Sequence, residues 1–298
     1  MAGRKVGARN VELFEDRESI ATTSDDEIKH LARVINATNF VTFKTLIDHQ
    51  FAYIKWIEDR HTKLKRLKTA EARKNRGPKE STYQKYKWYS EQLTILEAIN
   101  AFETFYKQTL ISLAKAIRDH VPAERLKGSV DSKILWSVRG RFSMPEIMIE
   151  HQIFHDLEKV DEWTLILIQK KRYTFGSANA GLRKSIRAIE TIFQIRHTLS
   201  HNQGYVTTSD AAKFKMRGRS IDSLRVIDPS KNKLGYAIRK FLLRETENFT
   251  EWLVDSTSDY LKSRVTECGA ILHRSILSRI ESEIGTSAKL QALPWISA

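Results

Sequence analysis

Apolar residues recur at helical spacing along most of the chain, in stretches separated by polar segments, Gly and Pro. Residues 1–23 are polar without periodicity and predict a mobile leader. Ser24 to Glu27 forms a capping-box pattern, and apolar positions three or four apart then predict a helix into the mid-70s, interrupted near 36–39. Gly77-Pro78 ends this helix, because proline lacks an amide hydrogen and disfavours helical geometry in the residue before it.

Further helices are predicted beyond Pro78 by the same periodicity. They cover about 81–120, 146–172, 180–200, 231–264 and 268–285, with irregular segments at 122–145 and 202–229. Only 12 Gly and 5 Pro occur among 298 residues, which favours long helices over a β architecture. We therefore expect an all-α fold. A leader and helical extension occupy 1–80, a helical bundle 81–265, and a C-terminal helix and tail 266–298.

Composition narrows the class of protein. Apolar residues make up 41% and charged residues 29% of the chain, a balance typical of globular domains. The single Cys268 excludes an internal disulfide and fits a reducing compartment. No apolar signal segment follows Met1 and no stretch approaches the ~18 apolar residues of a membrane span, so a cytoplasmic protein is expected. The net charge of +14 favours a polyanionic partner, although basic surfaces also serve solubility or an acidic protein partner.

One amphipathic helix is of particular interest. Between 182 and 196 the apolar residues fall on a narrow stripe: Leu182, Ile186, Ile189 and Phe193. The basic residues Arg183, Lys184 and Arg187 lie far from this stripe, as solvated charges do. Arg196 instead lies at the edge of the stripe, where a guanidinium needs a partner. A carboxylate across a helix-packing seam would explain this position without any chemistry.

The residues that follow Arg196 suggest more. His201-Asn202 comes five residues later, and Gly204 suits the left-handed turn that ends a helix. On a continuous helix, five residues rotate Arg196 and His201 about 140° apart. For the pair to act together, either the helix ends between them or two protomers combine their residues. The Asn-x-Gly sequence makes the first arrangement plausible.

Arg196, His201 and Asn202 suit RNA cleavage without a metal. A histidine titrates near neutral pH, so it can take a proton from a ribose 2′-hydroxyl or give one to the leaving 5′-oxygen. An arginine can bind the scissile phosphate with two hydrogen bonds and stabilise charge in the transition state. Asn202 would orient the imidazole or bind a phosphate oxygen. The product would carry a 2′,3′-cyclic phosphate, and DNA would be a poor substrate.

The pattern Arg196-His197-x3-His201-Asn202, at the end of an amphipathic helix and before a polar loop, resembles the R-x(4-6)-H motif of the HEPN superfamily. The apolar run from Leu96 to Phe105 looks like the long first helix of that bundle, and the resemblance covers about 82–264. It implies a four- or five-helix bundle that forms a homodimer with the motif at the interface. It also implies a metal-independent endoribonuclease in bacterial toxin or anti-phage defence systems, with an antitoxin or other partner protein.

By position, the resemblance makes Arg196 and His201 the catalytic pair, with Asn202 assisting them in the catalytic set, and His197, the polar residue after the Arg, an accessory residue. HEPN toxins whose antitoxin is a nucleotidyltransferase carry a Tyr two residues after the His, and Gln203 stands there in this chain. Control by modification of that Tyr is therefore not expected. Members without nuclease activity also exist, so a catalytically inactive RNA-binding or partner-binding module is the alternative.

Weaker signals surround the motif. Glu103 lies in an apolar run of the 81–120 helix and would either join the site with Arg196 or form an interhelical salt bridge. His151 and His155 have the spacing of metal ligands on a helix, but no third ligand is evident, so we expect no metal or cofactor. Basic clusters on both sides of the motif predict RNA contacts: Lys170, Lys171, Arg172, Lys213, Lys215, Arg217 and Arg219.

Overall fold

A computed structural model describes residues 34, 36–70, 80–126, 143–150 and 152–297. In these residues the fold is all-α, as the sequence predicts, with only two strands of two residues each. The long helices are α2 (Asn39–Ala70), α3 (Glu80–Ile117), α7 (Ala180–Asn202) and α9 (Leu234–Cys268). Shorter elements are η2 (Arg118–His120), η3 (Ala123–Arg125), α5 (Met144–Glu150), α6 (Leu157–Ile168), α8 (Thr208–Met216), β1 (Leu272–His273), α10 (Arg274–Glu283), α11 (Ala288–Gln291) and β2 (Trp295–Ile296).

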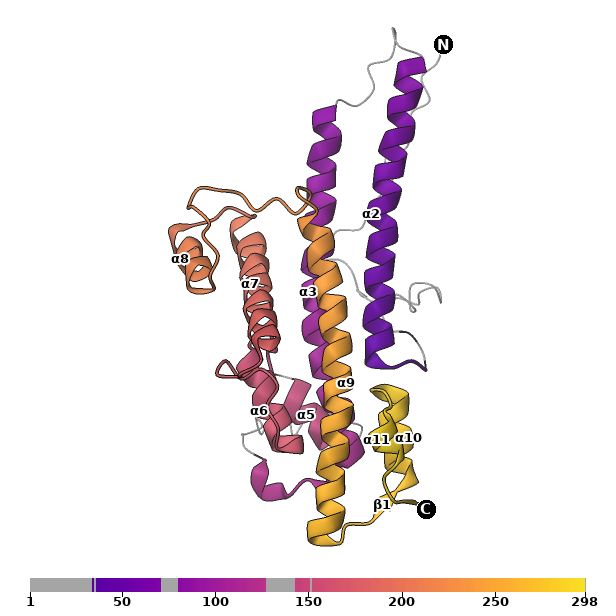
Figure 1. The fold of residues 1–298 in the computed structure, drawn as a ribbon. Helices are drawn as coiled ribbons and strands as arrows, with labels where there is room; N and C mark the ends of the chain where they lie inside the picture. The colour runs from indigo at the N-terminus through magenta and orange to yellow at the C-terminus, as the bar shows by residue number, and fades with distance from the viewer. Residues whose placement is uncertain (1–33, 35, 71–79, 127–142, 151, 298) are drawn as a thin grey trace, which may run out of the picture.

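Helix α3 forms the centre of the bundle. It packs against α2, α5, α6, α7, α9 and α10 (Figure 1). Its apolar residues recur at helical spacing and are fully buried at Ile95, Ile99, Phe102, Leu110, Leu113 and Ile117. In Figure 1 α9 runs beside α3, with α2 on one side and α6, α7 and α8 on the other. The site helix α7 therefore rests on the most deeply buried element of the fold.

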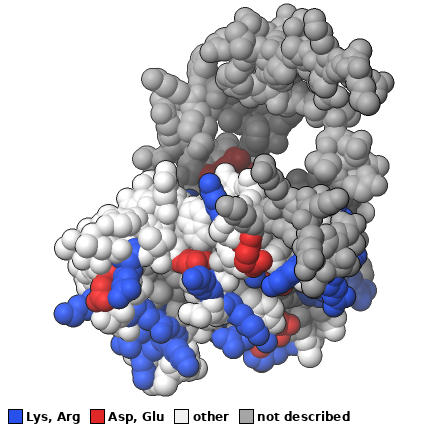
Figure 2. Space-filling model, turned by 90° about the horizontal axis from the view of Figure 1, so that it is seen from above, with Lys and Arg blue, Asp and Glu red and all other residues white. Residues whose placement is uncertain are grey.

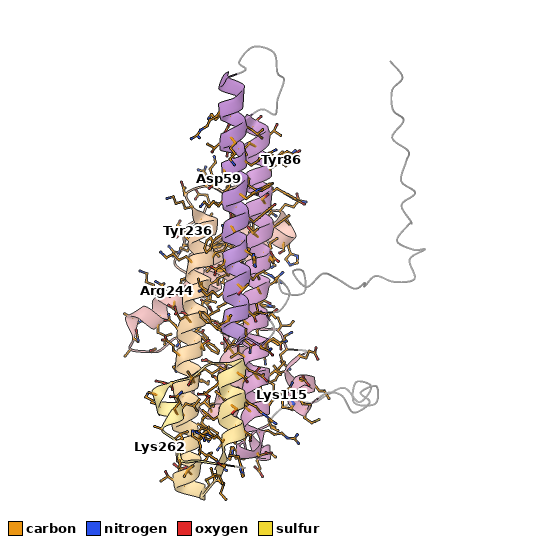
Figure 3. The ribbon with its side chains drawn as sticks, turned by 90° about the vertical axis from the view of Figure 1, so that its right-hand side faces the viewer. Asp59, Tyr86, Lys115, Tyr236, Arg244 and Lys262 are labelled. Atoms are coloured by element: carbon orange, nitrogen blue, oxygen red, sulfur yellow. The ribbon has the colours of Figure 1, made fainter. Side chains whose placement is uncertain are left out.

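Helix α2 belongs to the same core as the bundle. Its residues Phe43 and Ile47 are buried, and Phe43 contacts the rings of Phe102 and Phe105 on α3. The ends of α2 and α3 extend past the rest of the bundle as a helical pair, on which Asp59 and Tyr86 lie (Figure 3). The proposed leader at 1–23 and the capping box at Ser24 fall outside the described residues.

The sequence and the structure differ in two places that matter for the site. The helix predicted over 146–172 is divided into α5 and α6, because residues 152–156 are not helical and Asp156 caps the start of α6. The segment 202–229, predicted as a loop, contains α8. Thr207 and Asp210 form a capping box there, so two local hydrogen bonds start a helix that apolar periodicity alone does not indicate.

The C-terminal segment packs along the bundle, with α10 against α3 and α11 against α9, below α2 in Figure 1. Gly269 ends α9 in the left-handed region at φ 64°, and β1 then pairs in parallel with β2. Between the strands, α10 and α11 add Leu277, Ile280 and Leu290 to the core. In the part of the chain with described coordinates, no helix combines the length and the apolar character needed to cross a bilayer.

Candidate functional site

The whole Arg196–Asn202 segment belongs to one unbroken helix. Asn179 caps the start of α7 by accepting a hydrogen bond from the amide of Leu182. The helix ends at Gln203, whose φ is 51°, and Gly204 follows at φ 83° and donates its amide to the Thr198 carbonyl. The predicted stop at Asn202–Gly204 is confirmed. However, the idea that the helix ends between Arg196 and His201 is wrong, because the stop comes after both residues.

Arg196 is held against α3 by its own chain. Its Nε and Nη2 atoms donate to Asn100 Oδ1 at 3.3 and 3.2 Å, and Nε lies 3.8 Å from Glu103 Oε1. The side chain remains 31% exposed, which agrees with a position at the edge of the apolar stripe. Asn100 and Glu103 lie three residues apart on α3, so they face Arg196 together. The guanidinium is thus fixed in direction while part of the side chain remains open to solvent.

Glu103 connects Arg196 to a histidine outside the motif. Its Oε2 atom lies 3.9 Å from His155 Nδ1, and its Oε1 atom is buried without a hydrogen bond. Burial raises the pKa of the Glu103 carboxyl, and the positive charges of Arg196, His155 and Lys107 offset this only in part. A carboxyl with a raised pKa, between an arginine and a histidine, can accept or donate a proton nearer neutral pH than an ordinary glutamate.

His197 and His201 form a second group one turn apart on α7. Their ring centroids are 4.7 Å from each other. Partial burial and the nearby charges of His201 and Lys213 lower the pKa of His197, while Asp210 opposes the shift. His201 is exposed at the end of the helix. One face of α7 therefore presents two imidazoles, whereas Arg196 presents its guanidinium about 140° around the helix from His201.

Asn202 links the end of α7 to α8. Its Nδ2 atom donates to Asp210 Oδ2 at 2.8 Å, and the buried Asp210 also accepts from Gln194 Nε2 at 3.0 Å. The structure thus places the Asn202 amide nitrogen on a carboxylate and not on the imidazole of His201. Sequence analysis missed α8 and Asp210. Thr207 followed three residues later by Asp210 was the signal available, since an aspartate can serve where a capping box has glutamate.

The predicted RNA-binding residues separate into two groups. Lys170 Nζ lies 2.7 Å from Asp259, and Arg172 is largely buried with its Nη2 3.0 Å from Glu245. These two cations already have carboxylate partners. Lys213 and Lys215 lie on α8, and Lys171, Arg217 and Arg219 line a cleft together with basic residues of α7. Seen down the bundle, Lys and Arg side chains gather along one side of the described surface (Figure 2).

The proposed metal spacing is not reproduced for His155, which lies between α5 and α6 and not on a helix. His151 is outside the described residues. Within the described ranges, no three His, Cys, Asp or Glu side chains gather closely enough to hold a metal ion.

Comparison with known proteins adds no relative to this geometry. No protein-family model, no curated protein and no solved structure matches the chain. The functional assignment therefore depends on the residues of α3 and α7 themselves.

Proposed function

We propose that this chain is a metal-independent endoribonuclease that acts as a homodimer and leaves a 2′,3′-cyclic phosphate. The observation that carries the proposal is the arrangement on α7: the Arg196 guanidinium is fixed by α3, and an exposed His201 lies at the helix end beside His197. These are the groups that transesterification of RNA requires. A toxin or anti-phage effector, held in check by a partner protein, would suit such an activity.

The chemistry can be written with each proton accounted for. One imidazole removes the proton of the ribose 2′-hydroxyl, and the 2′-oxygen attacks phosphorus. The bond from phosphorus to the 5′-oxygen breaks, and a protonated imidazole gives that oxygen its proton. Arg196 binds the non-bridging phosphate oxygens, where negative charge accumulates. The pKa of His197 is lowered, which favours its neutral form, so it suits the role of the base better than that of the acid.

The dimer follows from the angle between the two motif residues. Because α7 is continuous, Arg196 and His201 of one chain point about 140° apart and cannot both contact the same phosphodiester group. Two copies of α7 that meet across a twofold axis would bring the Arg196 of one protomer to the His201 of its partner.

A first experiment tests the chemistry. Purified protein is incubated with a labelled single-stranded RNA in EDTA, and the product ends are identified by mass. We expect cleavage with cyclic phosphate ends, blocked by a 2′-deoxy substitution at the cleaved nucleotide. Arg196→Ala and His201→Ala should each abolish it, whereas the exposed residues Arg60 and His49 of α2 offer matched alanine controls that should not. A requirement for divalent metal, or activity in both motif variants, would reject the mechanism.

A second experiment tests the shared site. Arg196→Ala and His201→Ala proteins, each inactive alone, are mixed under conditions that exchange subunits. A heterodimer then contains one site with both residues intact. Random exchange makes half of the dimers heterodimers, so activity should recover to about a quarter of the wild-type level. No recovery, with exchange shown by two affinity tags, would exclude a site built from two chains.

The alternative is a catalytically inactive module that binds RNA or a partner with the same fold. Two contacts favour it: Arg196 is already bonded to Asn100, and the Asn202 amide is already bonded to Asp210. In that case RNA would be bound in a salt-dependent manner and recovered intact, equally by wild type and His201→Ala.

A further inference from the structure

A large basic cleft lies on the side of α7 that precedes the motif. Its volume is about 1200 Å³, and it is bounded by the first turns of α7, by Lys171 and Arg172 between α6 and α7, by the end of α8, and by the middle of α9. Helix α7 contributes Arg183, Lys184 and Arg187. The neighbouring segments contribute Lys171, Arg217, Arg219 and Arg244. In Figure 3 Arg244 lies on the side of α9 that faces away from α2.

These seven cations differ from the other basic residues near them because they lack carboxylate partners. None forms a salt bridge with an acidic residue in the described ranges. Glu245 is the one carboxylate among the lining residues, and it is bound to Arg172. An adjoining cavity of about 540 Å³ shows the contrast, because its Lys170 and Lys289 are paired with Asp259 and Asp255.

Arg217, in the cleft wall, has a donor atom without a hydrogen-bond acceptor. Its Nε atom is buried and has no hydrogen-bond partner, while Nη1 donates to the Lys213 carbonyl at 3.0 Å. Burial raises the pKa of Glu190 on α7, and the charges of Arg217 and Arg187 lower it in part. Glu190 forms no salt bridge with either arginine. Seven like charges around one concavity repel each other, and a bound polyanion would remove this cost.

The cleft also has features of a single-strand site. Phe241 and Trp252 of α9 are half-buried in its wall, where aromatic rings can contact unpaired bases. The N-terminus of α7 opens into the cleft, and the amides of a first helical turn favour anions. A cleft bounded by helices on several sides can accommodate a single strand. A duplex is wider and would bind more readily to an open surface through its phosphates.

We propose that this cleft binds the sugar-phosphate backbone of single-stranded RNA and delivers the strand to the motif. The choice of RNA over DNA rests on the proposed function. Arg187 lies about 21 Å before His201 along α7 and within about 40° of it around the helix axis. Helix α8 packs against α7 with Arg217 at its end in the cleft wall, and its Lys213 is close enough to lower the pKa of His197. The positive surface thus continues from the cleft, through Arg217 and Lys213, to the histidines.

Binding of a labelled single-stranded RNA to the His201→Ala protein, measured by fluorescence anisotropy over a range of salt concentrations, tests the proposal. The cleft variant replaces Lys184, Arg187 and Arg244 by Gln. All three are exposed and without salt bridges, so the fold should persist, which circular dichroism and urea unfolding will check. The matched control replaces Lys262, Arg274 and Arg279 by Gln. It also removes one Lys and two Arg, all exposed, from the opposite end of α9 and from α10.

Loss of three phosphate contacts should lower the slope of log affinity against log salt by about 2, and the affinity at 0.1 M salt on the order of 100-fold. The control should change both quantities much less. Equal losses in the two triple variants, or none in the cleft variant, would overturn the proposal. Equal loss would mean that net charge alone attracts the RNA.

The same proteins separate this inference from the proposed function. If RNA remains uncleaved by wild type but only the cleft variant binds it weakly, the nuclease is rejected and the cleft stands. If wild type cleaves RNA through Arg196 and His201, and the cleft variant with His201 restored binds and cleaves like wild type, the cleft alone is rejected. Equal affinity for the corresponding DNA strand would keep the cleft but place the preference for RNA at the motif.

Discussion

Replacing Asp210 by Ala should detach the end of α7 from α8. The Asp210 carboxylate is buried and accepts four hydrogen bonds: from Gln194 Nε2, Asn202 Nδ2, the Thr207 amide and the Thr207 hydroxyl, at 2.8 to 3.2 Å. A hydrogen bond to a charged group contributes about 1.5–3 kcal/mol, but water reaching the vacated space would restore part of it. We therefore expect the free energy of unfolding to fall by about 3–5 kcal/mol.

Urea unfolding followed by circular dichroism measures this loss as a lower midpoint with an unchanged slope. Asp222→Ala is the matched control, since Asp222 is 82% exposed and its contact with Arg225 is long at 4.0 Å. This variant should lower the free energy of unfolding by about 0.5 kcal/mol or less. If Asp210→Ala costs no more than this control, the Asp210 contacts do not hold α7 to α8.

The pH dependence of stability gives a second test of the Asp210 carboxylate. Burial alone would raise the pKa of Asp210, but hydrogen bonds from Thr207 and Asn202 and the charge of His197 outweigh it and hold the pKa below its usual value. A lowered pKa in the folded state means that the contribution is complete above the usual aspartate pKa and is lost as pH falls through the folded value. The stability difference between wild type and Asp210→Ala should therefore narrow only in strong acid. A difference that already narrows between pH 7 and the usual aspartate pKa, or that stays constant through strong acid as well, would contradict the assignment.

Three further variants test the fold around the site. Glu91→Ala leaves the fully buried Arg239 without the carboxylate 2.9 Å from its Nη2. The free energy of unfolding, measured in urea, should fall by about 3–5 kcal/mol. A small loss would show that Thr94 or water replaces the partner. Gly204→Ala should lower the free energy of unfolding by about 2 kcal/mol and Gly269→Ala by about 1 kcal/mol. Both glycines have positive φ, but only at Gly204 would a Cβ lie 3.2 Å from the Ile227 carbonyl oxygen. Equal losses in the two variants would refute the contribution of this steric contact. Glu103→Gln should stabilise the protein increasingly as pH rises from the usual glutamate pKa to the raised folded value, since burial raises the pKa of Glu103 and penalises its charged form. A pH-independent difference would show that Arg196 compensates fully for that burial.

Local sequence patterns determine the helical class of the chain and much of the site helix. Apolar residues at Leu182, Ile186, Ile189 and Phe193 set the buried stripe of α7, and the same spacing places Arg196 at the edge of that stripe with 31% of its side chain exposed. The Asn-x-Gly sequence locates the helix end, because Gln203 and Gly204 adopt left-handed φ values that glycine favours. These features depend on residues a few positions apart, so periodicity and capping rules reach them.

Contacts between distant segments decide the rest. The sequence leaves open whether Glu103 reaches Arg196. It does not show that Asn100 binds Arg196, that Asp210 accepts from the amide of Asn202, or that Glu245 pairs with Arg172. On the helical wheel Arg183, Lys184 and Arg187 look like ordinary solvated charges. Only the packing of α7 and α9 on α3, and of α8 on α7, brings Arg217, Arg219 and Arg244 to them and makes one basic cleft. Periodicity records which side of a helix is apolar, whereas the partner of each charged side depends on how the helices are arranged in three dimensions.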